Sequence, residues 1–99
     1  MKIITMCGSL KFTKEMMEIA EKLSKEGNCV LTPVYPVSTN KDSYTKEEIK
    51  IVGKMHLERI KLSDAIFVVN INNYIGESTK KEIEFAKSLN KEIMILNKS

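Results

Sequence analysis

The chain has 99 residues, of which 42% are hydrophobic and 29% charged, and its formal net charge is +3. This length favours a single globular domain, residues 1–99, and the composition excludes a disordered or membrane-embedded chain. Because lysines are mixed with glutamates along the whole sequence, we expect no nucleic-acid polymer as a partner.

Apolar periodicity predicts seven elements that alternate between strand and helix: strand 3–6, helix 12–23, strand 29–32, helix 45–62, strand 65–71, a helix from 78 or 79, and strand 92–96. Gly27 provides a left-handed stop after the first helix, and Thr45 with Glu48 forms a capping box that starts the second. The polar stretches 34–44 and 72–77 predict loops.

This alternation predicts an α/β fold, a small Rossmann-like or flavodoxin-like arrangement of three layers. Strands joined by helices form a parallel sheet with right-handed crossovers, and we expect four strands in the order 2-1-3-4 with three helices. Ligands of open parallel sheets bind outside the carboxyl ends of the strands, where the strand order reverses. The segments 7–11 and 70–78, which follow the first and third strands, are therefore expected to form the site.

The N-terminal residues and the two cysteines indicate the compartment. Residues 1–6 carry one charge and a short apolar run, without the longer apolar region and cleavage site of a secretion signal. Without such a signal, Cys7 and Cys29 are expected to be reduced thiols. They also lack the further Cys and His partners of a structural zinc site. We therefore expect a cytoplasmic protein with no membrane partner.

Three common uses of this fold are excluded by missing residues. The four glycines cannot form the glycine pattern of dinucleotide binding or a Walker phosphate loop. Cys7 begins a turn that could hold an anion, but Thr13 stands where a Cys-based phosphatase needs an arginine. A phosphoacceptor domain would need an acidic pair after the first strand, where this chain has Cys7 and Gly8. It would also need an aspartate after the third strand, where this chain has Asn70.

Three segments of the chain match one family pattern. They are Cys7-Gly8-Ser9-Leu10-Lys11, the run LSDAIFVV at 62–69, and GESTKKEIEFA at 76–86 with its continuation at 89–93. Read together, they resemble the nucleoside 2-deoxyribosyltransferase-like family, which includes deoxynucleoside 5′-monophosphate N-glycosidases. The third segment is the most specific, because it places Glu82 one turn inside a helix and four residues before Ala86.

The resemblance implies a chemistry. Breaking an N-glycosidic bond passes through an oxocarbenium-like state, which needs a carboxylate beneath C1 of the sugar. By position Glu82 matches the family's nucleophile, and its place one turn from a helix N-terminus is expected to keep it ionised. Gly8, Ser9 and Lys11 match the segment that holds the sugar 5′ end, so we expect a nucleoside 5′-monophosphate rather than a free nucleoside.

The same resemblance gives a full set of expected contacts. The substrate-binding residues would be Cys7, Gly8, Ser9, Lys11, Asn70, Gly76 and Ser78. No metal and no organic cofactor is implied.

The chain also departs from the family pattern. Where the monophosphate glycosidases carry an acidic residue, eight positions before Asp64, this chain has His56, a side chain that can serve as general acid to the leaving base. Ser78 replaces the usual glycine four residues before the nucleophile. The sequence ends after the fourth strand, where family members add elements that wall the pocket. We therefore expect a homodimer or larger homo-oligomer to complete it.

Structural roles remain open for the same residues. Glu82 can close a capping box at 79–82, in which case it points back at its own backbone. His56 lies on an apolar helical face and can be a packed or interfacial side chain. Cys7 can be a small residue that fills a tight turn, and Ser9 can cap the first helix.

Two other functions therefore compete with a glycosidase or transferase. The first is a non-catalytic module that binds a nucleotide or a nucleotide-derived signal in the same pocket. The second is a structural or interaction protein, in which His56 and the methionine-bearing helices form an oligomer interface. Release of a free base from a nucleotide, a nucleoside or NAD would distinguish an enzyme from both.

Overall fold

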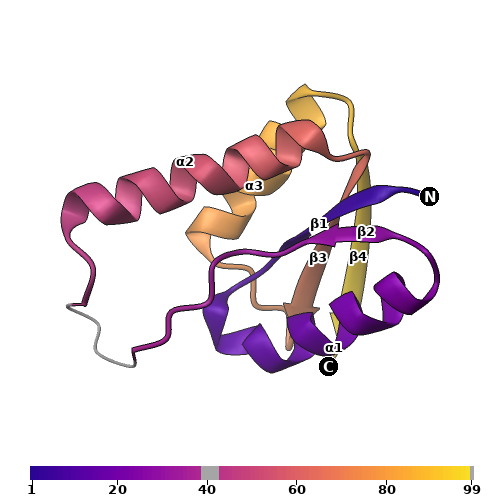
Figure 1. The fold of residues 1–99 in the computed structure, drawn as a ribbon, viewed down its shortest axis with the longest axis horizontal. Coiled ribbons are helices and arrows are strands. Elements are labelled where there is room, and N and C mark those ends of the chain that lie inside the picture. The colour runs from indigo at the N-terminus through magenta and orange to yellow at the C-terminus, as the bar shows by residue number, and fades with distance from the viewer. Residues whose placement is uncertain (39–42, 99) are drawn as a thin grey trace.

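The structure is a computed structural model that describes residues 1–38 and 43–98. Along the chain (Figure 1) the elements are β1 (Ile3–Cys7), the short 3₁₀ helix η1 (Leu10–Phe12), α1 (Thr13–Lys25), β2 (Cys29–Leu31), α2 (Lys46–Leu62), β3 (Ala65–Ile71), α3 (Glu77–Ser88) and β4 (Glu92–Lys98). Residues 39–42 of the predicted 34–44 loop lie outside the described residues.

The strands form one parallel sheet in the order β2-β1-β3-β4, which confirms the predicted four-stranded arrangement. In the register between β1 and β3, Cys7 lies beside Val68, so β1 ends at the middle of β3, which continues to Ile71 at the same edge of the sheet. At the opposite end of β1, the backbone N–H of Ile3 donates to Asp64 Oδ2 at 2.8 Å. Asp64 therefore has a structural role far from the predicted site.

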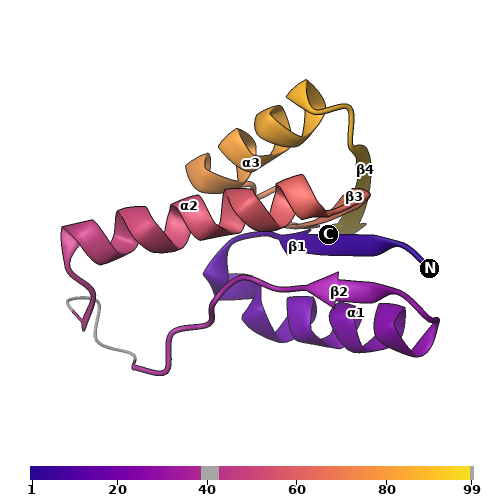
Figure 2. The same ribbon diagram turned by 45° about the horizontal axis from the view of Figure 1, so that its top comes forward.

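Helices cover both faces of the sheet, as a three-layer fold requires (Figure 2). Because side chains alternate along a strand, Ile4 and Met6 of β1 join the core beneath α1. Cys7 points to the other face, where it packs with residues of α2, β3 and α3, namely Ile60, Ile66, Val68 and Ala86. The fold thus turns the last side chain of β1 toward α2 and α3.

Local signals set the ends of the first two helices. Gly27, after α1, has a positive φ of 94°, the left-handed conformation predicted there. At the start of α2, Thr45 Oγ1 accepts from the Glu48 backbone N–H at 3.1 Å, and Glu48 Oε1 accepts from the Thr45 N–H at 2.8 Å. The predicted capping box is confirmed, and the N-terminal half of α2 projects beyond the sheet (Figure 1).

Buried hydroxyl groups fix the other end of α2 against β1. The Thr5 hydroxyl donates to the Arg59 carbonyl oxygen at 3.1 Å, and the Ser63 hydroxyl donates to the same oxygen at 2.8 Å. The two hydroxyls are also within hydrogen-bond distance of each other, and since each has a single hydrogen, a hydroxyl that donates to the other no longer donates to the Arg59 oxygen. These contacts hold the last turns of α2 over the sheet, and with them the helical face that carries His56.

The third helix differs from the prediction at its start. α3 begins at Glu77, and its N-cap is Gly76, which makes no side-chain capping bond. Thr79 lies inside the first turn and is 3% exposed, so it is not a cap. The capping-box interpretation of Glu82 is therefore wrong, because the chain enters the helix three residues earlier. Among the described residues, no helix combines the length and the apolar content needed to cross a bilayer.

Candidate functional site

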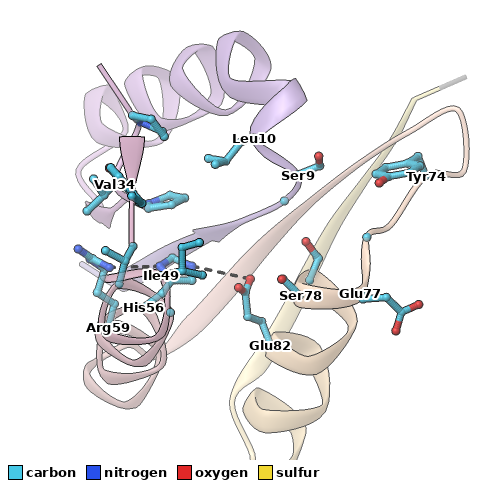
Figure 3. A pocket seen from close by; sticks show the side chains of 18 residues that line it. Ser9, Leu10, Val34, Ile49, His56, Arg59, Tyr74, Glu77, Ser78 and Glu82 are labelled. Atoms are coloured by element: carbon cyan, nitrogen blue, oxygen red, sulfur yellow. Dashed lines mark hydrogen bonds and ion pairs between the residues drawn. The ribbon is translucent and has the colours of Figure 1, made fainter. Parts of the chain in front are cut away.

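A cavity of about 560 Å³ lies at the carboxyl ends of the strands, where the reversal of strand order predicted a site. Its walls come from the segments after β1 and β2, from α2, and from the start of α3. In Figure 3, Ser78 and Glu82 of α3 lie between Ser9 and Tyr74 on one side and His56 of α2 on the other. The volume falls within the range of small-molecule sites.

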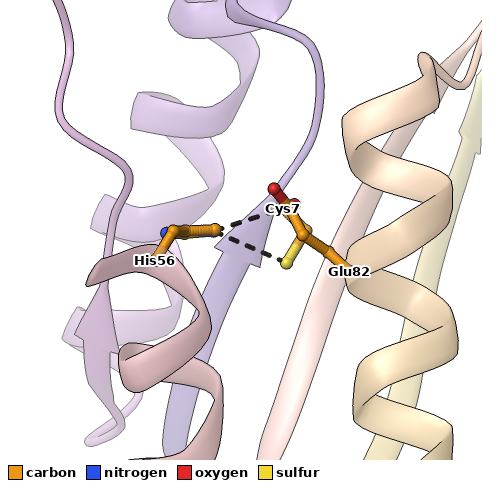
Figure 4. A group of neighbouring side chains, drawn as sticks. All are labelled: Cys7, His56 and Glu82. Carbon is orange, nitrogen blue, oxygen red and sulfur yellow. Dashed lines mark hydrogen bonds and ion pairs between the residues drawn. The ribbon is translucent and has the colours of Figure 1, made fainter. Parts of the chain in front are cut away.

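Three side chains meet at the base of this cavity (Figure 4): Cys7 from the end of β1, His56 from α2 and Glu82 from α3. His56 Nε2 lies 3.8 Å from Glu82 Oε1 and 3.8 Å from Cys7 Sγ. The side chains of His56 and Glu82 are 7% and 18% exposed, and Cys7 is fully buried. Glu82 thus faces two polar side chains rather than its own backbone. Cys7 belongs to the strand and not, as the sequence suggested, to the turn after it.

Burial controls the protonation of Glu82. Loss of water around the carboxyl raises its pKa from the ordinary 4.5 to about 7, and a hydrogen bond with the Cys7 thiol acts in the opposite direction. The expectation that the helix N-terminus keeps Glu82 ionised is therefore wrong: Glu82 is the sixth residue of α3, beyond the turn where the helix dipole acts. Burial, with the Glu82 carboxylate next in importance, also raises the pKa of the Cys7 thiol, which stays protonated.

His56 is neutral at physiological pH. Burial, followed by the nearby Arg59 guanidinium, lowers the pKa of His56 to about 4, against a smaller opposing effect from the Met6 backbone. Arg59 Nη1 lies 3.4 Å from His56 Nδ1. Since a guanidinium can only donate, this contact favours the lone pair on Nδ1 and the hydrogen on Nε2, which faces Glu82 and Cys7.

Most residues predicted for the site are brought together. Lining the cavity are Gly8, Ser9, His56, Gly76, Ser78 and Glu82, and Cys7 contacts His56 beneath it. Three predicted residues do not line it: Cys7, Lys11 and Asn70. Lys11 stands at the rim with its Nζ 3.5 Å from the ring centroid of Tyr74, and Asn70 lies near the carboxyl end of β3.

The turn after β1 passes close to its neighbours. A Cβ at Gly8 would lie 3.2 Å from Met16 Sδ and 3.4 Å from Val69 Cβ, so a glycine suits this position. Ser9 is the N-cap of η1, and its Oγ accepts from the Lys11 backbone N–H at 3.3 Å. Ser9 therefore caps the short turn η1 and not the first α-helix as predicted, because the N-cap of α1 is Phe12. The Ser9 hydroxyl hydrogen is still available to a ligand.

Two features of the site were not assigned from the sequence. Arg59 lines the cavity and contacts His56; the signal that could have found it is its position three residues after His56 on α2. An apolar wall faces the start of α3, and it is formed by Pro33, Val34, Pro36, Ile49 and Val52. Ile49 is 57% exposed although it is apolar, which leaves an apolar surface open to a ligand.

Comparison with known proteins identifies the fold. No protein-family model and no curated protein sequence matches the chain. A 2-deoxyribosyltransferase from the psychrotolerant bacterium Bacillus psychrosaccharolyticus superposes with a TM-score of 0.80 at 22% identity, over 96% of this chain and 72% of that one. A deoxyribosyltransferase from Leishmania mexicana superposes with a TM-score of 0.73 at 15% identity, over 98% of this chain and 65% of that one. The chain therefore has a nucleoside 2-deoxyribosyltransferase-like fold, as the sequence resemblance implied.

Proposed function

We propose that the protein is an enzyme that cleaves the N-glycosidic bond of a nucleoside 5′-monophosphate, with Glu82 as its nucleophile. The observation that carries the proposal is the place of Glu82 on the cavity wall, buried beside His56 and Cys7 and open to a ligand on one side. The fold shared with two deoxyribosyltransferases supports it. A carboxylate that only stabilised the helix would have no reason to be desolvated.

In the proposed reaction a carboxylate oxygen of Glu82 attacks C1 of the sugar. The bond between C1 and the base nitrogen breaks, its electron pair leaves with the base, and the sugar remains as an ester of Glu82. Water or a second base then attacks C1, the bond between C1 and the Glu82 oxygen breaks, and the carboxylate is regenerated. The proton lost by the attacking water or base is taken up by the departed base, and the product is the free sugar phosphate or a new nucleotide. The nucleophile acts in its ionised form, which is populated above the raised pKa of Glu82, about 7.

We assign His56 the role of hydrogen-bond donor through Nε2. With a pKa of about 4 it carries no charge at neutral pH, so the imidazolium expected of a general acid is scarce. The neutral ring still presents its Nε2 hydrogen toward Glu82, and toward the leaving base once a ligand fills the cavity.

The walls suit the two ends of a nucleotide. The apolar surface around Ile49 offers contact area to a flat base. At the opposite wall the backbone amides that start α3 receive no side-chain cap from the described residues, and Ser78 stands beside them. Amides at a helix start attract phosphate groups, and Lys11 adds a positive charge at the rim. A 5′-monophosphate uses all three features, whereas a nucleoside leaves the amides and the lysine unused.

A non-catalytic nucleotide-binding module is the second candidate. One observation favours it: His56 stands at the position where the monophosphate glycosidases carry an acidic residue. Because His56 is neutral, it is not the imidazolium that would protonate a leaving base. Such a module would be stabilised against heat by a nucleotide without releasing a base.

The test is release of a free base from a panel of ribo- and deoxyribonucleoside monophosphates, nucleosides and NAD. The wild-type protein and Glu82→Ala are compared, with Glu84→Ala as matched control because Glu84 is exposed on the same helix. Base released by the wild type and the control, but not by Glu82→Ala, would support the proposal. A folded Glu82→Ala protein with unimpaired release would refute it, and thermal stabilisation without release would favour the binding module.

A further inference from the structure

The cluster of Cys7, His56 and Glu82 combines three different metal-ligating groups. The thiol sulfur, an imidazole nitrogen and a carboxylate oxygen all lie within 4.8 Å of one another. In a tetrahedral Zn²⁺ site the donor atoms are about 3.3–3.8 Å apart, as bonds of about 2.0–2.3 Å require. The 3.8 Å separations of Nε2 from Sγ and from Oε1 are already near that range.

We propose that these three side chains form a Zn²⁺ site whose fourth position opens into the cavity. Three protein ligands with one free position is the arrangement of zinc sites that exchange a water or a substrate. A thiolate favours zinc over Mg²⁺ or Ca²⁺, which prefer oxygen ligands. The ligands come from β1, α2 and α3, so the folded core positions them.

The charges of the site balance in the buried environment. When zinc binds, the Cys7 sulfur loses its proton to water and becomes a thiolate, and Glu82 is bound as a carboxylate. One thiolate and one carboxylate neutralise the two positive charges of the metal. Zinc binding therefore gives the buried Glu82 carboxylate a positive partner. Because both Cys7 and Glu82 must lose their protons to bind the metal, acid weakens zinc binding.

Arg59 opposes the metal in a way that can be measured. To bind zinc, Nε2 must offer its lone pair, so the imidazole hydrogen has to move to Nδ1. Arg59 Nη1, 3.4 Å from Nδ1, can only donate there, and its positive charge also repels the cation. Glutamine at position 59 could accept from Nδ1 instead. Removing the guanidinium should therefore tighten zinc binding.

The metal would act as an inhibitor of the proposed reaction. Zinc bound to Glu82 withdraws negative charge from the carboxylate and occupies the space in front of it, so metal and substrate would compete for the same side chain. This inhibitory role rests on the proposed function, whereas the metal site itself does not.

The test is titration of the chelator-treated protein with Zn²⁺ by calorimetry, and with Co²⁺ by absorption. Thiolate ligation of Co²⁺ gives a charge-transfer band in the near ultraviolet. We expect that band and saturable zinc binding in the wild type, loss of both in Cys7→Ser, and no change in Cys29→Ser, whose thiol is exposed. Arg59→Gln should bind zinc about tenfold more tightly.

Absence of the Co²⁺ band from the wild type would overturn the proposal even if Cys7→Ser failed to fold. A band lost in Cys29→Ser and kept in Cys7→Ser would also overturn it, as would equal or weaker zinc binding by folded Arg59→Gln. No substrate is present, so these outcomes are independent of base release.

Discussion

Replacing Glu82 by glutamine should stabilise the fold at neutral and alkaline pH. The carboxyl is 18% exposed, and its pKa is about 7 in the folded chain against an ordinary 4.5. The folded state therefore binds this proton more tightly than the unfolded state does. As pH rises from 4.5 through 7, the folded state must accommodate a desolvated charge and loses stability relative to the unfolded chain. The pKa difference corresponds to about 3 kcal/mol above pH 7.

His56 produces the opposite dependence and has to be separated from that of Glu82. Its pKa is about 4 in the folded state against an ordinary 6.5, so the unfolded chain binds the proton more tightly and stability rises with pH between these values. The two effects partly cancel in the wild type. Because His56 is present in both proteins, the difference between wild type and Glu82→Gln isolates the carboxyl.

The assay is urea unfolding at a series of pH values in the presence of a chelator, with Glu84→Gln as the exposed control on the same helix. The advantage of Glu82→Gln should grow from about zero at pH 4 to about 3 kcal/mol at pH 8, with no such growth for the control. A Glu82→Gln protein that is equally stable, or less stable, at pH 8 would refute the reasoning. It would mean that hydrogen bonds to the carboxylate outweigh its desolvation.

Four further predictions follow from the same geometry. The rate of base release by chelator-treated protein should rise with pH to a plateau, with an apparent pKa of about 7, because the reaction needs ionised Glu82. A rate that falls as the pH rises through 7 would contradict this prediction. His56→Gln should retain more activity than His56→Ala in steady-state assays if the side chain only donates a hydrogen bond, and equal loss would favour proton transfer. Gly53→Ala should raise the unfolding free energy by about 1 kcal/mol, since a Cβ there would have no described atom within 4 Å and alanine is the better helix former. Calorimetric melting checks this. Light scattering should give the mass of a dimer or larger, because Ile51, Met55 and Leu62 expose apolar surface on α2; a monomer would contradict it.

The fold could be predicted because its signals are local. Apolar spacing placed β3 at 65–71 without error, and the capping box at Thr45 and Glu48 is complete within four residues. Strand order then followed from general rules on parallel sheets. The start of α3 was misplaced because Gly76 caps it without a side chain, whereas Thr79 offered the sequence pattern of a cap.

The site was predicted in position but not in its electrostatics. Glu82 and His56 were identified, yet their protonation depends on burial by three elements that only the folded chain brings together. Arg59 looks like an ordinary charge near a helix end until it is seen beside His56 Nδ1. Cys7 seemed to fill a turn because the sequence does not show that β1 continues one residue further.

The proposed role of Glu82 is tested most directly by the covalent intermediate. The protein is incubated with a substrate identified by base release, quenched in acid during turnover, digested, and examined by mass spectrometry. Trypsin cuts after Lys81 and Lys87 and so gives the peptide 82–87, which contains both Glu82 and Glu84. Fragmentation of this peptide in the spectrometer then shows which of the two glutamates carries the sugar. We expect the mass of the sugar phosphate on Glu82, absent from Glu82→Gln. A sugar adduct on another residue, or rapid release of base by Glu82→Gln, would contradict the account.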